Sequence, residues 1–347
     1  MSSIIAVALA TSVIGLGASL GAPAPLSAQV PIAAQVPIKE WPVPYADSRP
    51  RDPYVDGQNR VWFVGQKGNY LAYLEPESGK FKRYELEDGA LPHNLIVDKK
   101  GMVWYAGNGN GHIGKLDPAT GKITRYPMPN PEARDPHTLS FDDECDIWFT
   151  AQNSNFVGRL RTATGKIDLV EVATPNARPY GIAVDSKGRP WFNEFGNEKI
   201  ATIDPATLKI REHPLPNDRS RTRRLAITSD DRVWYVDYSR GYLGRFDPAT
   251  GQFKEWALPG GTSSLPYAMA VDSRDRLWMV EAGSQPNRLV GFDPKTEKFF
   301  GLTPIPSGGG TVRHMMYHQR SGQIWFGTDN NTIGRAQVTE ANTPPSS

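Results

Sequence analysis

The chain has 347 residues, of which 39% are hydrophobic, and it contains 33 glycines and 30 prolines. This composition supports a large folded domain with many turns and argues against disorder. The 39 basic and 37 acidic side chains leave a net charge of +2, which gives no electrostatic basis for binding nucleic acid or an anionic membrane. Cys145 is the single cysteine, so an internal disulfide framework is excluded.

The N-terminal segment is uncharged and apolar from Ile4 to about Ala22, and it ends in small residues with a plausible cleavage point after Ala28. We interpret residues 1–28 as a secretory signal peptide, which predicts a periplasmic or secreted protein; an uncleaved membrane anchor is the alternative. No later segment is long and apolar enough to span a bilayer, so no integral span is expected once the signal is removed. Residues 29–347 are then expected to form one domain and to act as a monomer.

Seven of the nine tryptophans recur at intervals of 42 to 47 residues, which is the period of a β-propeller blade. They are Trp62, Trp104, Trp148, Trp191, Trp234, Trp278 and Trp325.

Each of the first six repeats contains four short strand patterns in the same order. An apolar run such as 182–185 (IAVD) is followed by a polar turn, a strand with the tryptophan, a third strand, a turn such as 117–121 (DPATG), and a fourth strand. Four strands joined by three hairpin turns make one blade. The fold class predicted is therefore all-β, a seven-bladed propeller with four-stranded blades.

The two ends of the repeat region complement each other. The last repeat stops after its third strand, near Val338, whereas residues 38–44 form an isolated strand that resembles the fourth strand at 254–259. We expect this N-terminal strand to complete the last blade and close the ring, which removes the exposed edges of an open sheet.

The position eleven residues before each repeat tryptophan opens the innermost strand, where side chains converge on the central channel. We call its occupants the inner ring: Arg51, His93, His137, Tyr180, Arg223, Tyr267 and His314. All seven are large and able to donate a hydrogen bond, which favours a ligand site in the funnel over a purely structural position. The alternative is that these groups bond to one another and close the channel.

Acidic residues follow the tryptophans of three consecutive repeats, three positions later. They are Glu194, Asp237 and Glu281, and Asp329 lies four positions after the last tryptophan. We expect these acids on the same face as the inner ring, farther from the axis, as candidate metal ligands.

The repeat P-[HY]-x-[IL]-x-[VF]-D-x-x-G-x-[IVL]-W-F-x-E, together with N-x-I-G-x-[IL]-D, resembles the streptogramin B lyase (virginiamycin B lyase) family. Residues 178–204 (RPYGIAVDSKGRPWFNEFGNEKIATID) carry it best, and the resemblance extends from about Ile38 to Val338. It implies an enzyme that opens a cyclic depsipeptide at its ester by elimination, with a histidine as base and a magnesium ion at the developing enolate.

Residue by residue, His314 matches the last family histidine and Asp329 the acid that follows it. Tyr267 stands where the resemblance expects the preceding histidine, and Val312 where it expects an acid. A second register places the pair of histidines at His93 and His137. These correspondences make His314, His137 and His93 the candidate catalytic residues, and Arg51, Tyr180, Arg223 and Tyr267 the candidate substrate-binding residues.

Three functions remain open at this stage. The first is an exported lyase acting on an ester or lactone, with a small molecule or a cyclic depsipeptide-like ligand in the funnel. The second is a noncatalytic propeller that binds a ligand or a periplasmic protein. The third is a metal site held by His93, His137 and His314.

Overall fold

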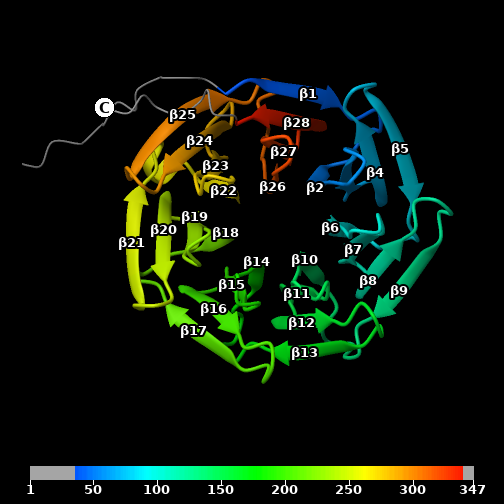
Figure 1. Cartoon of the computed structure of the whole chain (residues 1–347), viewed down its shortest axis with the longest axis horizontal. Coiled ribbons are helices and arrows are strands. Elements are labelled where there is room, and N and C mark those ends of the chain that lie inside the picture. Colours follow the sequence, from blue (N-terminus) through cyan, green and yellow to red (C-terminus); the bar gives the residue numbers. More distant parts are fainter. Residues whose placement is uncertain (1–35, 339–347) are drawn as a thin grey trace, which may run out of the picture.

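The computed structural model describes residues 36–338, which form a ring of seven four-stranded antiparallel sheets around a central channel (Figure 1). The predicted seven-bladed propeller is confirmed. Within the described residues the strands are accompanied by one short 3-10 helix, Gly261–Ser263, and no helix there is long and apolar enough to cross a membrane. The proposed signal peptide lies outside the described residues.

Each blade contributes one strand to each of four concentric layers (Figure 1). The innermost strands are β2 (Pro50–Val55), β6 (Pro92–Val97), β10 (Pro136–Phe141), β14 (Pro179–Val184), β18 (Thr222–Ile227), β22 (Pro266–Val271) and β26 (Met315–His318). The second strands, which carry the repeat tryptophans, are β3 (Val61–Gly65), β7 (Val103–Gly107), β11 (Ile147–Ala151), β15 (Pro190–Glu194), β19 (Val233–Asp237), β23 (Leu277–Glu281) and β27 (Gln323–Gly327).

Of the two outer layers, the outermost is the more exposed to solvent. The third strands are β4 (Tyr70–Glu75), β8 (His112–Leu116), β12 (Phe156–Leu160), β16 (Lys199–Ile203), β20 (Tyr242–Asp247), β24 (Arg288–Asp293) and β28 (Thr332–Gln337). The outermost strands are β5 (Lys80–Glu85), β9 (Ile123–Pro127), β13 (Ile167–Glu171), β17 (Ile210–Pro214), β21 (Gln252–Ala257), β25 (Lys298–Pro304) and β1 (Ile38–Pro42). Along an outermost strand such as β21 no residue is fully buried, whereas β19 is buried throughout.

The repeat tryptophans lie between neighbouring blades and are almost fully buried. Trp62, for example, packs with Leu95 and Val103 of the next blade. Its indole Nε1 donates to the carboxylate of Asp56, six residues earlier, at 2.8 Å, and the same bond recurs from Trp104 to Asp98 at 3.0 Å. This turn aspartate also accepts backbone N–H bonds, so the repeated Asp and Trp together fix the first hairpin of the blade.

The ring closes as predicted. β1 pairs antiparallel with β28, with Ile38 opposite Ala336 and Pro42 opposite Thr332 (Figure 1). Trp41 stacks on Trp325 with ring centroids 5.5 Å apart. The N-terminal strand is therefore the outermost strand of the seventh blade, and it buries an aromatic side chain there.

Candidate functional site

Six members of the inner ring lie at the start of innermost strands, where those strands are irregular, and His314 directly precedes β26. In β2, β6, β10, β14, β18 and β22 the register with the second strand shifts within the first residues. Such a bulge breaks the strict alternation of side chains between the two faces of a strand. As a result, contacts inside the channel come from the inner-ring residue and also from the residue that follows it.

Two histidines of the inner ring lie against each other. The rings of His93 and His137 have centroids 3.6 Å apart, and His93 Nδ1 donates to the backbone carbonyl of His137 at 3.1 Å. His137 Nδ1 lies 2.9 Å from the Thr138 hydroxyl. Burial lowers the pKa of both imidazoles well below the usual value, and nearby arginines lower it further. Both rings are therefore uncharged near neutral pH, and both Nδ1 atoms are engaged.

Two tyrosines and an arginine form the neighbouring part of the ring. The hydroxyls of Tyr180 and Tyr267 are hydrogen-bonded to each other, and Arg223 Nη1 donates to the Tyr267 hydroxyl at 2.9 Å. Burial opposes ionisation of Tyr180, but the guanidinium groups of Arg224 and Arg51 outweigh it, so the pKa of Tyr180 is lowered. Burial instead raises the pKa of Tyr267 to about 12. Tyr267 is thus a hydrogen-bonding group at neutral pH.

His314 stands apart from the histidine pair. Its Nδ1 atom is buried and has no hydrogen-bond partner among the described residues. Desolvation lowers the pKa of His314 to about 4, although the Asp52 carboxylate favours the charged form. His314 is therefore a neutral imidazole with a free ring nitrogen.

A buried ion pair that the sequence analysis missed crosses the channel. Arg224 donates to Asp52 Oδ2 at 3.3 Å, to the Thr138 hydroxyl at 3.1 Å and to the backbone carbonyl of Arg313 at 3.2 Å. Asn94 donates to the same carboxylate oxygen at 2.9 Å. We call Arg224 and Asp52 the cross-channel pair; it connects blades one, three, five and seven. Asp52, Asn94, Thr138 and Arg224 each follow an inner-ring residue directly, which is the signal that would have found them.

The three acids predicted from the tryptophan spacing end their second strands and are fully buried. Glu194 accepts a bond from Asn197 at 2.7 Å, and burial raises its pKa to about 7. Asp237 accepts from Arg240 at 3.1 Å. Glu281 accepts from the backbone N–H of Gly260 at 2.7 Å and also from Arg288. Each acid thus serves the loops of its own blade, and the structure does not bring the three together.

Asp329 is paired with arginines. It accepts a bond from Arg313 and lies 3.6 Å from Arg49 Nε. Within residues 36–338 no group of three or more His, Cys, Asp or Glu side chains is placed to hold a metal ion. Guanidinium groups occupy the surroundings of Asp329, and Val312 contributes no ligand, so these residues do not fit the magnesium ion that the resemblance implies.

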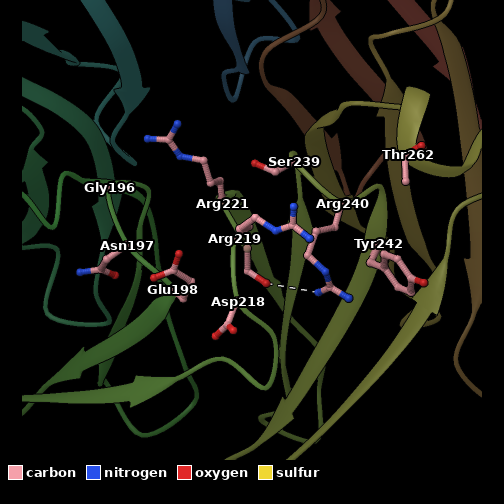
Figure 2. Close-up of a pocket in the computed structure, with 11 residues that line it drawn as sticks. Gly196, Asn197, Glu198, Asp218, Arg219, Arg221, Ser239, Arg240, Tyr242 and Thr262 are labelled. Atoms are coloured by element: carbon pink, nitrogen blue, oxygen red, sulfur yellow. Dashed lines mark hydrogen bonds between the residues drawn. The ribbon is translucent and has the colours of Figure 1, made fainter.

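A cavity of about 690 Å³ opens between blades four and five (Figure 2). It lies between the loop at Asn197 and the β19–β20 hairpin, and Arg219, Arg221 and Arg240 contribute to its lining. Arg221 also lies over the ring of Phe195, 4.7 Å from its centroid. Because Phe195 contacts Tyr180 of the inner ring, with centroids 5.6 Å apart, the cavity and the funnel share a wall.

The fold and the inner ring define a propeller with a polar funnel of histidine, tyrosine and arginine side chains at one mouth of its channel. The sequence model of the Virginiamycin B lyase family matches residues 110–343. The chain belongs to this family, which confirms the resemblance found in the repeats.

Solved structures agree with this assignment. A streptogramin B lyase structure is 26% identical with a TM-score of 0.79, and the match covers 88% of this chain and 98% of that one. A catalytically inactive virginiamycin B lyase from Staphylococcus aureus with quinupristin is 25% identical with a TM-score of 0.80, over 88% and 100% of the two chains. A comparison with curated proteins gives no match.

Proposed function

We propose that the chain is a carbon–oxygen lyase that opens an ester or lactone by elimination, with His314 as the base. The observation that carries the proposal is the neutral imidazole of His314, whose Nδ1 atom has no partner among the described residues. A base must be unprotonated and within reach of the substrate. The neutral imidazole meets the first condition, and a substrate reaches the buried Nδ1 only when the groups that cover it move aside. Family membership supports the reaction class, and the inactive Staphylococcus aureus variant carries an alanine in place of a histidine.

The reaction follows from general chemistry. His314 removes the proton alpha to a carbonyl, the electron pair forms a carbon–carbon double bond, and the bond from the beta carbon to the ester oxygen breaks. The ester leaves as a carboxylate, and no water is consumed. Arg51 and Arg223, which already donates to Tyr267, are the inner-ring cations that would bind the substrate.

His93 and His137 have a different role in this proposal. Because their Nδ1 atoms are engaged and their rings stack, they shape the funnel wall and place Tyr180, whose ring centroid lies 4.2 Å from that of His137. Of the four acids proposed as metal ligands, three support loops and Asp329 is paired with arginines, and no step of the reaction passes through a metal.

The test uses purified mature chain with a panel of cyclic depsipeptides and lactones, followed by mass spectrometry. Elimination gives a ring-opened product of unchanged mass, whereas hydrolysis adds one water. His314→Ala should reduce turnover about a hundredfold or more, because general-base catalysis contributes about that much. His213→Ala is the matched control, since His213 packs against Trp191 and Phe246 on the outer part of blade four. Turnover by His314→Ala at the parent rate would exclude His314 as the base.

A noncatalytic binding propeller is the second candidate. It is favoured by Tyr267, which stands where the resemblance expects a histidine and is held between Tyr180 and Arg223. Binding of a cyclic depsipeptide or lactone to the parent chain without any ring-opened product would support this candidate over the lyase.

Export to the periplasm or the medium remains part of the proposal. N-terminal sequencing of protein recovered outside the cytoplasm should find a start near Gln29. An intact Met1 on soluble cytoplasmic protein would contradict export.

A further inference from the structure

The floor of the funnel carries more positive than negative charge. Arg51, Arg223 and Arg224 lie near Tyr180, and all three guanidinium groups act on its hydroxyl. Asp52 is the carboxylate paired with two of them, Arg224 at 3.3 Å and Arg51 at 3.8 Å. The inner-ring histidines are neutral near pH 7 and add no charge of their own. Among residues 36–338, Arg223 thus has a tyrosine hydroxyl as its hydrogen-bond partner and no paired carboxylate.

Donor atoms in this group remain without acceptors. Arg51 is 6% exposed; its Nη1 donates to Gln66 at 2.8 Å and its Nε lies 3.8 Å from the Asp52 carboxylate, while its Nη2 has no hydrogen-bond acceptor among the described residues. Arg223 Nε is likewise buried and unpaired. An unpaired buried donor on a charged group is costly, so such a donor needs a partner that these side chains do not supply, such as water, an anion or a ligand. Guanidinium N–H groups match carboxylate oxygens in geometry as well as charge.

The surroundings of Arg223 are aromatic. Its guanidinium carbon lies 4.1 Å from the ring centroid of Phe195, 4.3 Å from that of Tyr238 and 4.4 Å from that of Tyr267. These aromatic rings hold the guanidinium group in place by cation–π contacts. Arg221 contacts the same Phe195 ring from the adjoining cavity, which provides room for the rest of a ligand.

We propose that the funnel floor is a carboxylate site, so that the natural ligand is an organic acid with an apolar or aromatic body. The carboxylate binds between Arg51 and Arg223, and the body lies against Phe195 and extends toward the cavity of about 690 Å³. This inference rests on the proposed function for the statement that the ligand is also an ester or lactone. The substrate class is then an ester that bears a separate carboxylate.

The test measures binding without turnover, by titration calorimetry of the mature chain at low salt. Phenylacetate is the probe. Phenylacetamide, which has the same body without the charge, is the first control. Inorganic phosphate, which has charge without an apolar body, is the second. Phenylacetate should bind at least tenfold more tightly than phenylacetamide and than phosphate. Equal binding of acid and amide, equal binding of phosphate, or no binding of phenylacetate would each overturn the proposal.

Variants locate the site. Arg223→Gln should weaken phenylacetate binding at least tenfold and leave phenylacetamide unchanged, and Tyr267→Phe should weaken it less. Arg51→Gln gives a second measurement at a separate donor. Arg211→Gln is the control variant, because it also removes one positive charge but lies on the exposed outermost strand β17. It should bind phenylacetate as the parent does. Phenylacetate binding that survives in both Arg223→Gln and Arg51→Gln would place the site elsewhere.

The calorimetry and the lyase assay test the two proposals independently. Turnover of neutral lactones without phenylacetate binding would refute the carboxylate site and leave the lyase intact. Phenylacetate binding without any ring opening would support the carboxylate site and refute the lyase.

Discussion

Replacing Arg224 with leucine should destabilise the propeller in a way that depends on pH. Arg224 is 3% exposed, and Asp52, its partner at 3.3 Å, is 1% exposed. In the parent, charged neighbours including Arg224 hold the pKa of Asp52 below its usual range in spite of burial. Without the guanidinium group, burial dominates and the pKa of Asp52 rises. Breaking a buried pair in this way typically costs about 3–5 kcal/mol.

The free energy of protonating Asp52 agrees with this cost. If Asp52 takes up a proton in the folded variant at pH 7, the cost is about 1.4 kcal/mol for each pH unit above its unfolded pKa of about 3.9, or about 4 kcal/mol. The parent keeps Asp52 ionised in both states between pH 5 and 7, so this residue adds no pH dependence to its stability there. Arg224→Leu has a lower free energy of unfolding than the parent, and this difference should therefore shrink by about 3 kcal/mol between pH 7 and pH 5.

Urea unfolding at the two pH values measures the effect. Arg224→Leu and the double variant Asp52→Asn/Arg224→Leu are compared with the parent chain. The double variant has no carboxylate to protonate, so its difference from the parent should be the same at pH 5 and pH 7. The reasoning would be refuted if Arg224→Leu lost less than about 1 kcal/mol of unfolding free energy relative to the parent, or if this loss did not change with pH.

Three further predictions concern closure, a buried acid and the proposed base. Trp41→Ala should lower the free energy of unfolding by about 3–5 kcal/mol because a buried aromatic ring is lost from the closing strand; a change in urea midpoint no larger than that of Lys39→Ala would contradict the closure. The folded pKa of Glu194 is raised to about 7, so this carboxyl lowers stability as pH rises from about 4 to 7. The free energy of unfolding of Glu194→Gln, measured in urea, should accordingly rise by up to about 3 kcal/mol relative to that of the parent between pH 4.5 and 8. A difference between the two proteins that stays the same over this pH range would count against a buried acid. If His314 is the base, turnover should be lost as pH falls through about 4 and should survive a chelator, and a midpoint between pH 6 and 7 would point to a different group.

The architecture could be predicted from the sequence because it depends on repeated local chemistry. An aspartate six residues before a tryptophan fixes a hairpin wherever it occurs, as at Asp56 and Trp62. The tryptophan period gives the number of blades, and the missing strand of the last repeat shows how the ring closes. Each of these features can be read from a short stretch of chain.

The interior of the channel was predicted only in part. The inner ring was found from its spacing, but Asp52 and Arg224 were missed because a regular strand would turn the next side chain away from the channel. The bulges at the start of the innermost strands cancel that alternation. The acids at Glu194 and Glu281 were expected as metal ligands because spacing does not show that a neighbouring amide or guanidinium group already uses the carboxylate.

The closure of the ring also affects how the molecule folds. The first six blades are built from hairpins between neighbouring strands, so each can form as soon as its own repeat is present. The seventh needs Ile38 to meet Ala336, nearly 300 residues away along the chain. Bringing such distant ends together carries a large loop-closure entropy, and contacts of this kind form late. The unpaired edges of β1 and β28 are then the surfaces through which incompletely folded chains would join one another, so high protein concentration during refolding should favour assemblies in which the closing strand comes from a second molecule.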